Sequence, residues 1–161
     1  MAEVATATGN VPITVVVGYQ DPAILARCRA LLADVEEIDI ASAVEDGAEV
    51  IGAIKEAAPR VLLLDLDLAS RSKVSLLPVL RRLSASTAVL LLTNSHPAED
   101  IVPVLATGAK GHLDVRHVDR FLVTAVKALD AGEAWVPRRM VSALLAYLGS
   151  VGGAANSFLR G

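Results

Sequence analysis

Cysteine is almost absent from this chain, and long basic or apolar runs are missing altogether. The 161 residues include one cysteine, Cys28, so no internal disulfide can form and a reducing compartment is expected. The net charge is -3 and no basic run occurs, which argues against an electrostatic footprint for nucleic acid. No apolar stretch reaches the roughly 18 residues of a membrane span, and no signal-peptide core follows Met1. These absences predict a cytoplasmic protein without membrane contact.

What is present is the composition of a folded domain. Hydrophobic residues make up 53% of the chain and charged residues 20%, enough for one domain with a real core. Residues 1–11 are small, polar and aperiodic, and are expected to form a flexible tail. Between residues 12 and 132, five apolar runs alternate with five segments of helical spacing. The expected strands are 13–18, 38–44, 60–66, 87–93 and 109–115, and the expected helices are 21–35, 46–58, 75–83, 96–109 and 118–132.

Five strand–helix pairs in alternation predict an α/β fold with a doubly wound, five-stranded parallel sheet. The expected strand order is 2-1-3-4-5, as in flavodoxin- and CheY-like folds, with the site outside the carboxyl ends of the strands. Those ends bring together residues 18–21, Asp65 and Thr93. Asp65 directly follows four apolar residues, although an aspartate is rarely fully buried unless it is paired. It therefore either does chemistry at the sheet edge or caps the turn that follows.

The chain continues past this domain with an additional apolar segment. Residues 133–148 are expected to form an extra C-terminal helix that carries Val141, Leu144, Leu145 and Leu148 on one side. The Gly- and Ser-rich residues 149–161 are expected to be a flexible linker or end. The apolar side of the helix would stay exposed unless it packs on the domain or on a second chain, so a homodimer is predicted.

Several stretches together resemble the receiver domain of a two-component response regulator of the NarL/FixJ type. They are Asp65 after its apolar run, "LLLT" ending at Thr93, "ATGAKGHL" and "LDAGEAWVPRRM". The resemblance covers about residues 12–147 and identifies 12–132 as the receiver domain. It implies that a histidine kinase phosphorylates an aspartate at the end of the third strand. It also implies a Mg²⁺ ion held by that aspartate and an acidic pair, with a threonine and a lysine that bind the phosphoryl oxygens.

Asp65 matches the phospho-acceptor and Thr93 the switch hydroxyl of that family, but other positions depart from it. The acidic pair falls on Tyr19 and Gln20, and the lysine falls at or beside Val115, where none is present. His112 matches the aromatic switch residue of the fifth strand. A neutral Gln20 and the missing lysine leave Mg²⁺, if it binds, only Asp65 as a weak ligand, so no cofactor is expected. Arg116 could replace the lost charge if its loop turned inward.

Two further carboxylates allow more than one interpretation. Asp21 precedes Pro22 and can cap the first helix, or it can supply a ligand from one position along. Asp67 can point to solvent in the loop after Asp65 or join a small polar pocket with Tyr19, Gln20, Asp21 and Thr93. That pocket could sense a small ligand, although nothing in the sequence specifies one.

The main functional hypothesis is an atypical receiver that is the N-terminal regulatory part of a transcription factor. It would act by protein–protein interaction or dimerisation, largely without phosphorylation and without enzymatic activity. A conventional receiver phosphorylated on Asp65 by a histidine kinase and a ligand-sensing domain are the alternatives. Only 13 residues follow Leu148, too few for a helix-turn-helix module, so DNA contact would require a separate C-terminal domain.

Overall fold

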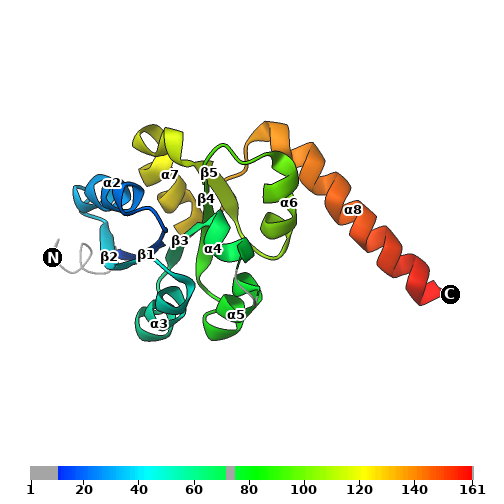
Figure 1. Ribbon diagram of the computed structural model, residues 1–161, viewed down its shortest axis with the longest axis horizontal. Helices are drawn as coiled ribbons and strands as arrows, with labels where there is room; N and C mark the ends of the chain where they lie inside the picture. The colour runs from blue at the N-terminus through cyan, green and yellow to red at the C-terminus, as the bar shows by residue number, and fades with distance from the viewer. Residues whose placement is uncertain (1–10, 72–74, 161) are drawn as a thin grey trace, which may run out of the picture.

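The computed structural model describes residues 11–71 and 75–160, with the side chains of the last helix described as far as Val151 (Figure 1). The predicted tail, apart from Val11, lies outside this part of the chain. Five strands form one parallel sheet: β1 (Ile13–Gly18), β2 (Ile38–Val44), β3 (Val61–Asp65), β4 (Ala88–Thr93) and β5 (Gly111–Asp114). Their order is β2-β1-β3-β4-β5, which confirms the predicted topology.

Helices cover both faces of the sheet (Figure 1). One face packs against α2 (Pro22–Ala33) and α7 (Val118–Asp130), which follows a 3-10 turn, η1 (Val115–His117). The other packs against α3 (Gly47–Ala57), α4 (Leu66–Arg71), α5 (Leu76–Leu83) and α6 (Ala98–Ala106), together with the start of α8 (Arg138–Arg160). The central strands are apolar on both sides because each side faces a helical layer. No helix in the described residues is long and apolar enough to cross a membrane.

The helix starts follow the sequence signals. The Asp21 carboxylate accepts a hydrogen bond from the Ala23 N–H at 2.9 Å, so Asp21 caps α2, and Pro22 is its first residue. Cys28 lies in the core beneath α2, where burial raises the pKa of its thiol to about 11. Helix α6 has nine residues around the interior Pro103 and is shorter than the predicted 96–109.

Two predicted segments differ from the structure. Strand β3 stops at Asp65 because Leu66 already begins α4, so Asp67 lies in a helix and its predicted loop position is wrong. The last helix begins only at Arg138, since Pro137 disfavours helical backbone in the residue before it. It then continues to Arg160 through residues 149–160, which the sequence predicted as a linker. No proline follows Pro137, and glycine weakens a helix by only about 1 kcal/mol per residue.

The segment between α7 and α8 extends the edge of the sheet. Trp135 pairs with Gly111 as a parallel bridge: its N–H donates to the Lys110 carbonyl, and its carbonyl accepts from the His112 N–H, both at 2.9 Å. The Trp135 ring contacts Phe121 of α7 with 6.0 Å between centroids. Trp135 thus anchors the chain that leads into α8.

His112, at the position of the aromatic switch residue, is buried in this region. Its residue is 3% exposed, and neither ring nitrogen has a hydrogen-bond partner within the described part of the chain. Leu113 packs in the α2–α7 core, so strand alternation places His112 on the opposite face, toward α6 and α8. Burial, with a smaller contribution from Arg139, lowers the pKa of the imidazole, while Asp114 partly opposes this. The folded state therefore favours neutral His112.

Gly111 is needed because the Trp135 backbone comes very close. A β-carbon at residue 111 would stand 2.3 Å from the Trp135 carbonyl oxygen. We expect Gly111→Ala to push the segment away from β5 and to lower the free energy of unfolding by about 1–3 kcal/mol, measured by urea denaturation. Gly52→Ala is the matched control: its β-carbon meets nothing within 4 Å, and it should stabilise α3 by about 1 kcal/mol. Equal stability of Gly111→Ala and wild type would contradict the close approach.

The unpartnered imidazole gives a second prediction. We expect His112→Phe to raise the free energy of unfolding by about 1–3 kcal/mol near pH 8, because it removes buried polar atoms without partners. Because the folded pKa is lowered, the unfolded state takes up the proton first as pH falls below the ordinary value of about 6.5. Wild-type stability should therefore decline toward acid through this group, and His112→Phe should flatten that decline.

Chemical denaturation between pH 8 and pH 5 measures both effects. His117→Gln, which alters an exposed histidine, is the control and should leave the decline unchanged. A less stable His112→Phe protein with the wild-type pH dependence would show that the imidazole is satisfied in solution.

Candidate functional site

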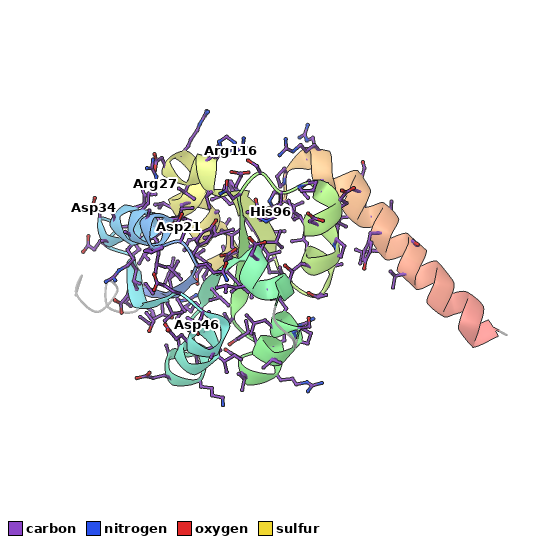
Figure 2. The ribbon with its side chains drawn as sticks, in the orientation of Figure 1. Asp21, Arg27, Asp34, Asp46, His96 and Arg116 are labelled. Atoms are coloured by element: carbon purple, nitrogen blue, oxygen red, sulfur yellow. The ribbon has the colours of Figure 1, made fainter. Side chains whose placement is uncertain are left out.

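A cavity of about 250 Å³ lies at the carboxyl edge of the sheet, where β1, β3 and β4 end. Asp21 and His96, which lie on its rim, are labelled in Figure 2. Its lining residues are Tyr19, Gln20, Asp21, Ile24, Asp65, Asp67, Asn94 and His96. The structure therefore brings together all the predicted pocket residues except Thr93, which is buried beside the cavity at the end of β4.

Asp65 is the centre of this arrangement. It is 3% exposed, and each carboxylate oxygen accepts one backbone N–H bond, from Gln20 at 3.1 Å and from Asp67 at 2.9 Å. Burial raises the pKa of the carboxyl group, and the two hydrogen bonds partly oppose this rise. The carboxylate thus stands at the sheet edge and accepts a bond from the first turn of α4, which agrees with the predicted cap of the turn. Chemistry at Asp65 stays a prediction.

The two positions of the missing acidic pair point in different directions. Tyr19 is 5% exposed and packs into the core with α2. Burial, and then the nearby carboxylates of Asp65, Asp67 and Asp21, raise the pKa of its phenol, which stays neutral. Gln20 is exposed and contributes its backbone N–H to Asp65. Neither side chain offers an anion to a metal ion.

The loop after β4 closes one side of the cavity through His96. The Asn94 N–H donates to His96 Nδ1 at 2.9 Å, so the ring proton of the neutral imidazole is on Nε2. His96 Nε2 lies 3.1 Å from Asp67 Oδ1 and donates to it. Ser95 between them has a φ of 56°, a left-handed conformation that turns the chain back toward α4.

Arg116, in η1 directly after β5, places a guanidinium next to the position of the missing lysine. The Arg116 side chain donates to both oxygens of Asp114, at 2.9 and 3.0 Å, and is largely exposed. Burial alone would raise the pKa of Asp114, but the bonds from Arg116 and from the Ser95 N–H lower it to about 2. Arg116 therefore neutralises Asp114 and does not turn inward toward Asp65. Val115 packs against the core.

Sequence reasoning did not assign His96 or Asn94 to this site. The usable signal was local: Asn94 directly follows Thr93 at the end of a central strand, and His96 lies two residues further on, at the same edge as Asp65. His112, by contrast, does not line the cavity.

The residues that line this cavity do not fit a metal ion well. Mg²⁺ prefers carboxylate oxygens with several retained waters, but here the carboxylates already have structural roles. Asp65 accepts two backbone bonds, Asp67 pairs with His96, and Asp21 caps α2. Among the described residues, no three His, Cys, Asp or Glu side chains are grouped so as to hold a metal ion.

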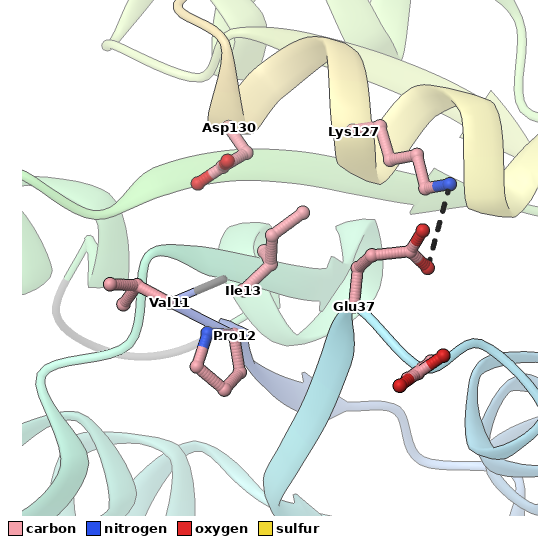
Figure 3. Close-up of a pocket in the computed structure, with 7 residues that line it drawn as sticks. Val11, Pro12, Ile13, Glu37, Lys127 and Asp130 are labelled. Carbon is pink, nitrogen blue, oxygen red and sulfur yellow. Dashed lines mark ion pairs between the residues drawn. The ribbon is translucent and has the colours of Figure 1, made fainter. Parts of the chain in front are cut away.

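A larger cavity, of about 520 Å³, lies at the opposite, amino-terminal edge of the sheet (Figure 3). Val11, Pro12 and Ile13 line it at the start of β1, together with charged residues from the β2 and α7 sides. Lys127 and Glu37 face each other there at 3.8 Å. It is remote from Asp65 because it lies at the other end of the strands.

Comparisons with known proteins agree with this architecture. The sequence model of the family described as "Response regulator receiver domain" matches residues 15–127. The oxygen regulatory protein NreC of Staphylococcus epidermidis is 30% identical over 117 residues, which cover 68% of this chain and 51% of that protein. The nitrate/nitrite response regulator protein NarL of Escherichia coli K12 is 25% identical over 137 residues, covering 85% of this chain and 63% of NarL. The chain thus spans about half the length of the first of these relatives.

Solved structures share the fold at lower identity. The isolated receiver domain of RcsB from Salmonella enterica serovar Typhimurium superposes with a TM-score of 0.73 at 23% identity, covering 83% of this chain and 98% of that domain. The receiver domain of the putative response regulator NarL from Mycobacterium tuberculosis gives a TM-score of 0.69 at 24% identity, covering 76% and 98%. The chain belongs to the response regulator receiver domain family, and its curated relatives are regulators of the NarL/FixJ type.

Proposed function

We propose that this receiver domain regulates without a phosphoryl group on Asp65, through interactions with other protein chains. The observation that supports this most strongly is the charge around Asp65. Three carboxylates line the cavity, and no lysine or arginine lines it among the described residues. A phosphoryl donor is itself an anion, so it would be repelled unless a cation neutralised the charge.

The contacts around the cavity support the same proposal. Arg116 is bound to Asp114, and the position of the lysine is taken by the apolar Val115. Tyr19 buries a neutral ring where the family has an acid. The His96–Asp67 contact fixes the loop after β4 against α4 without any bound group. Polar groups that could otherwise bind Mg²⁺ or phosphate are thus bonded to other groups of the domain.

We further propose that the domain is the regulatory part of a transcription factor and acts as a homodimer. Structures of the related RcsB are described as dimers bound to DNA and as an RcsB–DNA complex. In this proposal a separate C-terminal domain provides the DNA contact, and a histidine kinase or another signalling protein is a possible partner of the receiver.

Incubation with acetyl phosphate and Mg²⁺, followed by intact-mass measurement, tests the proposal. We expect no stable acyl phosphate on the wild-type chain, because among the described residues there is no metal site and no lysine or arginine lines the cavity beside Asp65. The matched variant Tyr19→Asp/Gln20→Asp/Val115→Lys restores the family's charges. It should gain acyl phosphate on the order of tenfold or more, since opposite charges about 4 Å apart attract by roughly 1–4 kcal/mol.

Adding Asp65→Asn to the restored variant is the control and should abolish the labelling. Wild-type protein that is labelled as strongly as the restored variant, and loses the label with Asp65→Asn, would show a conventional phospho-acceptor and refute the proposal.

A further inference from the structure

The last helix carries an apolar stripe that the domain leaves uncovered. Helix α8 spans 23 residues, and at a rise of 1.5 Å per residue it is about 34 Å long. Only its first turns pack on the domain: Met140 is buried, and Leu144 is partly buried against the same core. The side chains of Val141, Leu145, Leu148 and Val151 are 40%, 63%, 46% and 53% exposed. Figure 1 shows the helix leaving the body beside α6 and ending far from it.

These residues follow the spacing of a coiled-coil seam. Val141, Leu144, Leu148 and Val151 are separated by three, four and three residues, which is the a–d pattern of a heptad repeat. Leu145 widens the stripe on one side. The opposite side of the same turns carries small or polar residues, namely Ser142, Ala143, Ala146, Gly149 and Ser150. The helix is therefore amphipathic, with its apolar side directed at solvent.

The composition of α8 indicates that this helix is only weakly stable in a monomer. Gly149, Gly152 and Gly153 lie within it, and glycine is the weakest helix former after proline. Helices gain most of their stability from packing an amphipathic face, yet every described side chain from Leu145 to Val151 is exposed. A packing partner along this stripe would supply the missing contacts.

The middle of α8 carries no charged residue, and this favours some kinds of binding partner over others. No Asp, Glu, Lys or Arg occurs between Met140 and Leu159. A membrane-surface helix needs basic residues on its polar face, and a charged protein partner would find nothing to pair with. Between Met140 and Leu159 a second α8 meets no like-charge repulsion, and its heptad spacing is complementary to itself.

The apolar surface also continues from α8 onto the domain. A groove of about 390 Å³ runs beside the helix, and its apolar lining includes Leu105 and Ala109 from the α6 region, Val136, Leu144 and Leu148. A helix packed on the stripe would cover this groove as well. The interface would then extend from α8 onto the domain.

We infer that two copies of this chain associate through α8, with Val141, Leu144, Leu145, Leu148 and Val151 forming the seam. The inference rests on the proposed function in that it names the surface of the proposed homodimer.

Sedimentation equilibrium of the full chain, over a range of concentrations, is the test. We expect a monomer–dimer equilibrium in the wild-type protein. Leu145→Glu/Leu148→Glu places two charges in the seam and should weaken association on the order of 100-fold or more, since central interface residues dominate binding. Both residues are exposed, so the domain should stay folded, as the far-ultraviolet circular dichroism and unfolding midpoint would verify.

Ala143→Glu/Ala146→Glu is the matched control. It adds the same charges to the same helix on the opposite, exposed side and should leave the dimer intact. A dimeric Leu145→Glu/Leu148→Glu protein would overturn the inference and move the interface elsewhere, while the proposed homodimer would stand. A monomeric wild-type chain would overturn both, without touching the result of the acetyl phosphate experiment.

Discussion

The two backbone N–H bonds to Asp65 are the contacts on which the rest of the site depends. Through them, the loop after β1 and the first turn of α4 both donate a hydrogen bond to the same buried carboxylate. A buried anion is costly unless hydrogen bonds or a cation compensate it, and here the backbone supplies two hydrogen bonds. The position of Tyr19 and the start of α4 directly after β3 both follow from this geometry.

Around that carboxylate, polar groups have found partners within the domain. His96 bridges Asn94 and Asp67, and Arg116 binds Asp114. Such internal pairs occupy polar atoms that could otherwise bind a metal ion or a phosphoryl group. A fixed arrangement of this kind supports the proposal that the domain regulates through the protein chains that it binds.

Much of the fold could be predicted from the sequence because its signals are local. The apolar run that ends at Asp65 and the Asp21–Pro22 start of α2 specify a strand end and a helix cap within a few residues. The role of His96 could not be predicted in this way, since it depends on the left-handed Ser95 and on the position of α4. Arg116 was ambiguous because its choice between Asp114 and Asp65 depends on where η1 turns. The helical continuation beyond residue 148 was missed because glycines in the sequence favoured a linker.

The strand-like pairing of Trp135 has a mechanical consequence for α8. Two backbone hydrogen bonds join the segment before the helix to the edge of the sheet, so the start of α8 must follow any movement of β5. The helix would then rotate as a rigid rod about Arg138, its first residue. A tilt of about 10° at that point would move the far end by roughly 6 Å, given a rise of 1.5 Å per residue over its length. A small rearrangement beside His112 can therefore cause a large displacement of the end of α8.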